Sequence, residues 1–223
     1  MTRDGQLAEG IPIDRRRLKK RLQAEEQLGV AGPAREPRAL VLEGEAGIGK
    51  STLWHAAVSE ASARVVRVLT ARPAEAERRL TFAGLGDLFD AVLADVLPAL
   101  TPPRRRALAV ALLVEEASAG VDPRALGVAV RNGLEVLAAE QALVVAVDDV
   151  QWLDPPSAAA LAFAFRRLRA PVRVLLARRL VEGAEASELE RSLAHIPLER
   201  IGVGPLTVGA IQRLLRDRLG RTF

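Results

Sequence analysis

The sequence contains no cysteine and no tyrosine, and its two histidines, His55 and His195, lie far apart in the chain. Without cysteine the chain forms no disulfide bond and offers no thiolate to a metal, and two isolated histidines lack the spacing of a metal site. No apolar run approaches the ~18 residues that span a bilayer, and the N-terminus lacks the apolar core of a signal peptide. These absences predict a cytoplasmic protein without membrane contact.

Aromatic residues are scarce as well, at 3% of the chain against 49% for all hydrophobic residues. Alanine, leucine and valine therefore carry the packing, which suits a helix-rich α/β domain better than a β-sandwich. A length of 223 residues is enough for one substantial core.

Positive charge is abundant but concentrated in one place. The formal net charge is only +4, although six positive charges lie in the run RRRLKKR at 15–21, so the rest of the chain is slightly acidic. The run has two interpretations, contact with a nucleic-acid backbone or a solvated helix face anchored by Leu18 and Leu22. We favour the second, and do not expect this chain to bind nucleic acid directly.

Short apolar runs alternate with segments of helical periodicity along the chain. The pattern predicts strands at 38–44, 64–70, 142–149 and 172–179, with a last short one within 199–206. It predicts helices at 50–63, 82–97 (closed by Pro98) and 157–169, two more that begin after Thr101 and Asp122, and an N-terminal helix at 14–28 before a linker at 29–37. Nearly continuous apolar strands between helices indicate a parallel sheet that is covered on both faces.

A phosphate-binding loop is the most specific motif, because residues 44–51 read GEAGIGKS and fit the pattern GxxxxGK[ST]. Glycines let backbone N–H groups point inward at phosphate oxygens, and the following helix adds the positive end of its dipole. Lys50 is one of only three lysines among 32 basic residues, and a compact ammonium reaches β- and γ-phosphates where the wide fork of arginine fits less well. The predicted ATP-binding residues are Gly44, Glu45, Ala46, Gly47, Ile48, Gly49, Lys50, Ser51 and Thr52.

Two aspartates end the apolar run ALVVAVDD at 142–149. An acidic residue at the end of a strand beside a phosphate loop can hold Mg²⁺, and a neighbouring carboxylate can orient the attacking water. We therefore predict that Asp148 and the Ser51 hydroxyl hold Mg²⁺, and that Asp149 acts with Lys50 in catalysis. The alternative is that the two aspartates merely begin a solvated loop.

Arg178 and Arg179 end the strand VRVLLARR. If that strand ends at the same edge of the sheet, the two guanidinium groups are placed to reach the γ-phosphate and respond to its presence. The alternative, simple surface charge, is equally compatible with the sequence.

Four stretches together resemble the ATPase domain of large ATP-binding LuxR-family transcriptional regulators, in the STAND branch of AAA-related P-loop NTPases. They are LEGEAGIGKSTLW, LTFAGLGDLFDAVL, VVAVDDVQWLDPPSAAALAF and LLARR, and the similarity runs over about residues 38–219. In place of the family's Gly-Arg-Glu-type segment before the first helix, this sequence has GIPIDRRRLKKRL.

The resemblance implies a three-layer α/β sandwich in which the strand before the phosphate loop neighbours the strand that ends at Arg178 and Arg179. It also implies a helical insertion between the second and third strands. We expect a basic helix and linker at 1–37, a P-loop ATPase core at 38–204 and the start of a lid subdomain, incomplete here, at 205–223. The family's DNA-binding helix-turn-helix is not among these 223 residues.

The function expected from the resemblance is an ATP-dependent switch that hydrolyses ATP slowly and signals through conformational change, by self-association or contact with further regulator domains. An actively turning-over AAA-type ATPase or a P-loop kinase is the alternative. A third possibility is a vestigial module that contacts DNA through residues 15–21. Steady-state ATPase activity separates the first two, and salt-dependent DNA binding tests the third.

Overall fold

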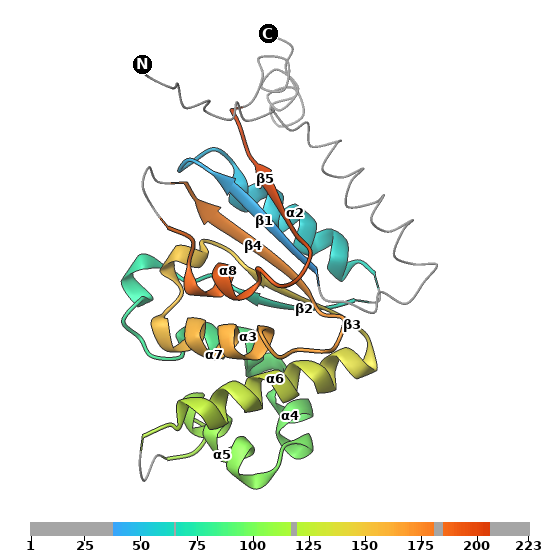
Figure 1. The fold of residues 1–223 in the computed structure, drawn as a ribbon, viewed down its shortest axis with the longest axis vertical. Coiled ribbons are helices and arrows are strands. Elements are labelled where there is room, and N and C mark those ends of the chain that lie inside the picture. The colour runs from blue at the N-terminus through green and yellow to red at the C-terminus, as the bar shows by residue number, and fades with distance from the viewer. Residues whose placement is uncertain (1–37, 65, 117–119, 181–184, 206–223) are drawn as a thin grey trace, which may run out of the picture.

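The computed structural model describes residues 38–64, 66–116, 120–180 and 185–205 (Figure 1). The strands are β1 (Arg38–Gly44), β2 (Val66–Ala71), β3 (Ala142–Val147), β4 (Arg173–Arg179) and β5 (Leu198–Gly202). The α-helices are α2 (Lys50–Ser62), α3 (Ala83–Phe89), α4 (Leu93–Val96), α5 (Pro102–Ala111), α6 (Pro123–Glu140), α7 (Pro155–Phe165) and α8 (Glu188–Ser192). Short 3₁₀ turns lie at Glu75–Glu77, Asp90–Val92, Leu97–Ala99 and Val150–Trp152.

The five strands form one parallel sheet in the order β2-β3-β4-β1-β5. β1 therefore lies between β4 and β5, and Gly44 at its end is level with Arg179 at the end of β4. This arrangement confirms the parallel sheet and the predicted neighbourhood of β1 and β4. Because all strands run in one direction, their carboxyl ends meet at a single edge, where open α/β sheets bind ligands.

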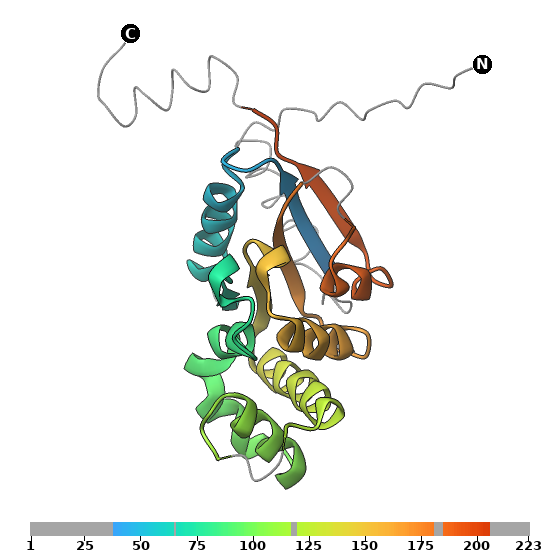
Figure 2. The ribbon, with the colours of Figure 1, turned by 90° about the vertical axis from the view of Figure 1, so that its left-hand side faces the viewer.

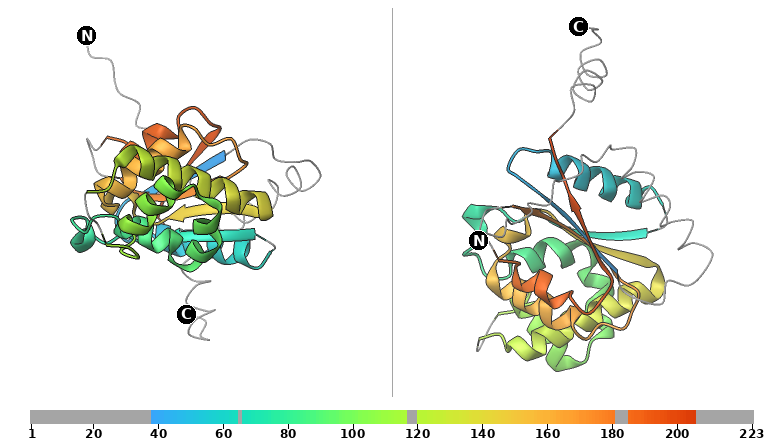
Figure 3. Two further views of the ribbon diagram at one scale, coloured as in Figure 1. Left: turned by 90° about the horizontal axis from the view of Figure 1, so that it is seen from below. Right: turned by 45° about the horizontal axis from the view of Figure 1, so that its top comes forward.

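Alternate residues of the strands pack into two separate cores, one on each face of the sheet. Val41 and Leu176 belong to one core, and their neighbours Leu42 and Ala177 belong to the other. In the part of the chain that the structure describes, α2 covers one face, with Trp54 buried beneath it, and the remaining helices lie on the opposite side (Figure 3). The near-continuous apolar strands are thus explained by burial on both faces.

The insertion between β2 and β3 contains α3 to α6, as predicted. Its helices α4 and α5 lie at the far end of the molecule from the loop that joins β1 to α2 (Figure 1 and Figure 2). The prediction of one continuous helix over 82–97 was wrong, because α3 ends at Phe89 and a 3₁₀ turn, α4 and another 3₁₀ turn follow. Apolar residues at three-to-four spacing satisfy 3₁₀ and α turns alike, so periodicity did not reveal the breaks.

Aspartates cap the two longest helices on the face of the sheet opposite α2, which are α6 and α7. Asp122 caps α6 by accepting from the backbone N–H groups of Arg124 and Ala125, as the sequence predicts. Asp154 caps α7 and also accepts from the N–H groups of Phe82 and Gly84 at 2.9 and 3.0 Å. One buried carboxylate therefore joins the start of α3 to the start of α7.

The other predicted elements of the core are present within a few residues of their expected bounds, and α8 was not predicted. The N-terminal helix and linker over 1–37, the basic run 15–21 and the lid segment 206–223 lie outside the described residues. In the described ranges, every helix is too short or too polar to cross a membrane.

Candidate nucleotide-binding site

The loop between β1 and α2 bends sharply at two glycines. Gly47 and Gly49 have φ angles of 72° and 101°, in the left-handed region that favours glycine. Gly49 is the N-cap of α2, and neither a capping side chain nor an acidic residue of the first turn occupies this helix end. The backbone N–H groups at the start of α2 are therefore available to an anion.

Gly44 is glycine for a different reason, which is the close approach of its neighbours. A Cβ atom at this position would lie 2.7 Å from the carbonyl oxygen of Val203 and 2.9 Å from a methyl carbon of Ile48. The Gly44 carbonyl accepts from the Leu180 N–H at 2.8 Å. The chain segments that follow β4 and β5 thus hold the base of the loop in place.

Lys50 begins α2 and is 5% exposed, with its ammonium group donating to the backbone carbonyl of Glu45 at 2.7 Å. Burial lowers the pKa of Lys50 from its ordinary 10.5, and the carboxylates of Asp149 and Asp148 partly offset that effect, whereas Arg179 adds to it. Side chains from the ends of β3 and β4 are therefore within electrostatic reach of Lys50 on α2.

Asp148 and Asp149 follow β3 directly, at the same edge of the sheet. Asp148 is 5% exposed, its backbone N–H donates to Ala71, and its carboxylate accepts from the Asp149 N–H at 3.0 Å. Asp149 is half-buried and has a left-handed backbone, with φ 44° and ψ 51°. The two neighbouring aspartates thus differ in burial and in backbone conformation.

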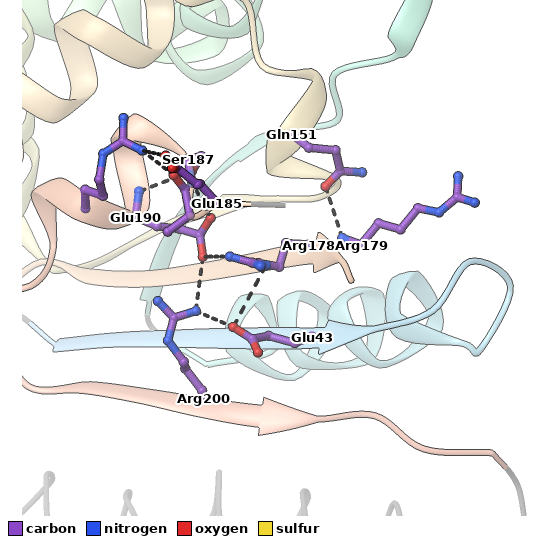
Figure 4. A network of polar contacts seen from close by, with 10 residues as sticks. Glu43, Gln151, Arg178, Arg179, Glu185, Ser187, Glu190 and Arg200 are labelled. Atoms are coloured by element: carbon purple, nitrogen blue, oxygen red, sulfur yellow. Dashed lines mark hydrogen bonds and ion pairs between the residues drawn. The ribbon is translucent and has the colours of Figure 1, made fainter. Parts of the chain in front are cut away.

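The two arginines at the end of β4 point in different directions (Figure 4), and alternation along β4 assigns them to opposite faces of the sheet. Arg178 is 12% exposed and is paired with Glu190 at 3.0 Å and with Glu43 at 4.0 Å. Arg179 extends away from that cluster, on the side where it affects Lys50. Strand alternation therefore separates the predicted pair, and the geometry favours Arg179 over Arg178 as a phosphate contact.

The oxygen donors at this edge suit Mg²⁺. Ser51 supplies a hydroxyl and Asp148 a carboxylate, both hard ligands, and magnesium is usually held by one or two such side chains together with substrate phosphates and water. Among the residues that the structure describes, no three His, Cys, Asp or Glu side chains gather into a metal site of their own. The residues therefore fit an ion that arrives with a phosphate ligand.

Sequence reasoning missed two features of the site. Gln151 bridges Asp149 and the backbone of Arg179, and a cluster of charges joins Glu43, Arg178, Glu190 and Arg200 beside the end of β1 (Figure 4). Both depend on strands that are distant in sequence, so no local pattern marks them. The exposed side chains of Glu45 and Thr52 lie on the loop and the first turn of α2 without a described polar partner.

Several solved structures have a similar fold. The chain resembles the ORC1 protein of Aeropyrum pernix, solved in complex with DNA, with a TM-score of 0.51 and 16% identity over 91% of this chain and 49% of that one. It also resembles AMPPCP-bound DnaA of Aquifex aeolicus, with a TM-score of 0.47 and 18% identity over 96% and 55% of the two chains. At this identity the likeness shows the fold alone, and the chain spans about half the length of these proteins.

A STAND protein with a tetratricopeptide repeat sensor from Pyrococcus horikoshii is a further structural neighbour, with a TM-score of 0.46 and 13% identity over 89% of this chain and 25% of that one. No curated protein matches the chain. Residues 15–177, most of the sequence, match the AAA ATPase domain family. The protein therefore belongs to the AAA ATPase domain family and has the fold of a P-loop NTPase.

Proposed function

We propose that the protein is a nucleotide switch that binds ATP with Mg²⁺, hydrolyses it slowly and signals through conformational change. The observation that carries the proposal is the convergence of Lys50, Asp148, Asp149 and Arg179 at the edge where β1, β3 and β4 end. A buried ammonium within electrostatic reach of two carboxylates, beside an uncapped helix start, suits a polyanion that brings a divalent cation.

Each group has a chemical task in this proposal. The loop N–H groups and Lys50 bind the β- and γ-phosphates, Ser51 and Asp148 hold Mg²⁺, and Asp149 orients the attacking water. When bound, Mg²⁺ neutralises charge on the phosphate oxygens. Arg179 contacts the γ-phosphate, so the end of β4 responds to whether ATP or ADP is present.

The resemblance to large ATP-binding LuxR-family regulators of the STAND branch supports a role in transcription regulation. The nucleotide state of this domain would then control self-association or contact with further regulator domains in the cytoplasm. DNA contact belongs in this proposal to another part of such a regulator, and not to residues 38–205.

Thermal unfolding with and without ATP·Mg²⁺ tests the proposal. A ligand that binds only the folded state stabilises it by about 2.7 kcal/mol at a hundredfold excess over Kd, which corresponds to a Tm increase of roughly 5–10 °C for a domain of this size. Lys50→Ala should abolish most of the increase without unfolding the protein.

Arg173→Ala is the matched control, because it removes a positive charge from the exposed start of β4, at the opposite edge of the sheet. This variant should retain the full Tm increase. An undiminished increase in Lys50→Ala would show that ATP does not bind in this loop.

A further inference from the structure

Gln151 lies in the 3₁₀ turn after β3 and connects two predicted parts of the nucleotide site. Its side-chain Nε2 donates to Asp149 Oδ1 at 2.8 Å, and its Oε1 accepts from the backbone N–H of Arg179 at 3.1 Å (Figure 4). A carboxylate only accepts and a backbone N–H only donates, so the two partners fix the orientation of the amide. Both ends of the Gln151 side chain are therefore used.

The hydrogen bond from Gln151 restrains the Asp149 carboxylate. The backbone of Asp149 is in the left-handed region, which is uncommon for residues other than glycine, and the torsion that orients an aspartate carboxylate has a broad preference. The hydrogen bond from Gln151 occupies Oδ1 and leaves Oδ2 without a described partner. One oxygen is thus held in place while the other is available to a water molecule.

The second hydrogen bond of Gln151 connects its side chain to the backbone of β4, through the N–H of Arg179. Arg179 is the last residue of β4, and the next N–H, that of Leu180, donates to the carbonyl of Gly44 at the base of the phosphate loop. A short series of hydrogen bonds therefore runs from the Asp149 carboxylate through Gln151 to β4 and the loop. These bonds restrain the Asp149 carboxylate relative to the base of the loop.

We propose that Gln151 is a positioning residue for ATP hydrolysis, which holds the Asp149 carboxylate so that Oδ2 faces the attacking water. The inference rests on the proposed function, because it assigns Asp149 to the water and the loop to ATP. A displacement of about 1 Å at a reacting group costs roughly a hundredfold in rate. Loss of the Gln151 amide should therefore lower the rate of hydrolysis and leave ATP binding unchanged.

Two variants of Gln151 separate the hydrogen bond to Asp149 from packing. Gln151→Met keeps the length of the side chain and removes both hydrogen bonds. Gln151→Glu keeps an acceptor for the Arg179 N–H but places a carboxylate against Asp149. The rate of phosphate release at saturating ATP·Mg²⁺ should fall at least tenfold in both variants. KM for ATP should stay within twofold of the unmodified protein, and the ATP-induced Tm increase within 2 °C, because binding of ATP in the ground state is expected to change little.

A double-mutant cycle with Asp149→Ala distinguishes positioning from a purely structural role. Once the carboxylate is absent, Gln151→Met should change the residual rate less than twofold, because groups that act as a unit are not additive. Gln141→Met is the matched control, since Gln141 precedes β3 at the opposite edge of the sheet, and it should leave the rate unchanged.

Three results would overturn the inference while ATP binding stands. They are a rate within twofold of the unmodified protein, or above it, in Gln151→Met; the same fractional loss with and without the Asp149 carboxylate; and loss of the ATP-induced Tm increase in Gln151→Met. Absence of a Lys50-dependent Tm increase in the unmodified protein would instead refute the proposed function, and the role of Gln151 with it.

Discussion

Lys50 is a buried ammonium group that the fold tolerates because two carboxylates lie nearby. Burial disfavours its charged form and lowers its pKa, and the carboxylates of Asp149 and Asp148 favour the charge. Bound phosphates would add much stronger favourable charge than either aspartate, since they bring several negative oxygens into contact with the ammonium. The pKa of Lys50 should therefore be higher in the ATP complex than in the free protein.

This difference in pKa makes ATP binding depend on pH. A group whose pKa rises on binding supports the complex fully below its pKa in the free protein, and that support is lost as pH increases above it. We expect ATP affinity to be constant near neutral pH. As pH rises, the affinity should begin to decrease before pH 10.5, because the pKa of Lys50 in the free protein is lower than that value, and the decrease should reach about tenfold per pH unit at most. Titration calorimetry between pH 7 and about pH 10 measures both the affinity and the proton taken up.

Lys50→Arg provides the control, because a guanidinium stays protonated throughout this range. Its affinity for ATP should be weaker at neutral pH, since the wide planar group fits the loop less well, but nearly independent of pH. Equal pH dependence in the two proteins would assign the effect to another group.

The sharp loop between β1 and α2 could be predicted from the sequence because its pattern is local, and its role in binding phosphate stays a prediction. Lys50 and its glycines form a contiguous pattern, and the two aspartates follow a recognisable buried strand. By contrast, Gln151 acquires its role from a backbone N–H on β4, which is distant in sequence. The opposite directions of Arg178 and Arg179 follow from strand alternation, but the sequence did not reveal which of the two faces the loop.

The ends of β1, β4 and β5 are joined to α8 by a cluster of four charged side chains (Figure 4). Glu190, on α8, is 3% exposed and accepts from Arg178 at 3.0 Å and from Arg200 at 3.1 Å. Arg200 also pairs with Glu43, the residue before the phosphate loop. The two negative charges of the carboxylates and the two positive charges of the guanidinium groups thus neutralise each other in this cluster.

Glu190 should stabilise the fold most strongly above the pKa of an ordinary glutamate. Burial alone would raise the pKa of Glu190, but hydrogen bonds from the Ser187 N–H, Arg178 and Arg200 outweigh it and lower the pKa below 4.5. The lowered pKa contributes stability that is present above pH 4.5 and is lost as pH falls through the folded-state value. We expect Glu190→Gln to cost about 3 kcal/mol at neutral pH, because it leaves the largely buried Arg178 guanidinium with only the more distant Glu43 carboxylate, at 4.0 Å.

Urea unfolding of Glu190→Gln from pH 7 down to about pH 3.5 measures this cost, which should shrink below pH 4.5 as the unmodified Glu190 becomes protonated. Glu188→Gln is the matched control on the same helix, at an exposed position, and should stay within about 0.5 kcal/mol of the unmodified protein. An equal effect of the two substitutions, or a cost of Glu190→Gln that does not vary with pH, would contradict the assignment.

Elements with a strong local signal were predicted and those defined by tertiary contacts were not. Asp122 followed by proline marked the start of α6, and continuous apolar runs marked β1, β3 and β4. The five-residue helix α8 begins with a capping box of Ser187 and Glu190, yet it has no apolar periodicity long enough to recognise. The breaks after Phe89 were hidden because the apolar spacing continues through them.

The order of the strands brings together residues that the sequence keeps far apart. The phosphate loop, the two aspartates and Arg179 meet because β4 inserts between β3 and β1. Alternation of strands and helices predicts a parallel sheet but not the order of its strands, and the expected contact of β1 with β4 came from the resemblance to a known family. Pairing over such separations depends on helix packing on both faces, which no local pattern encodes.

At the scale of the whole molecule, the proposed function joins a phosphate-binding loop to a short side chain, Asp149, for orienting water. Asp149 is one methylene shorter than a glutamate, so its carboxylate extends less far from β3 toward an attacking water. This combination favours a long-lived ATP complex over rapid turnover, as a switch requires.

We therefore expect phosphate release by the 223-residue chain to be well below the ~10 s⁻¹ that is typical of enzymes. Asp149→Asn should lower the rate further and retain ATP binding, because the amide cannot take part in proton transfer from water. Asp148→Asn should instead weaken Mg²⁺-dependent binding, because a neutral amide is a poorer ligand for a hard cation. Phosphate release and ATP-induced Tm shifts of the three proteins, with and without Mg²⁺, measure both effects. A rate of tens per second, or an Asp149→Asn variant as fast as the unmodified protein, would favour an actively turning-over ATPase over a switch.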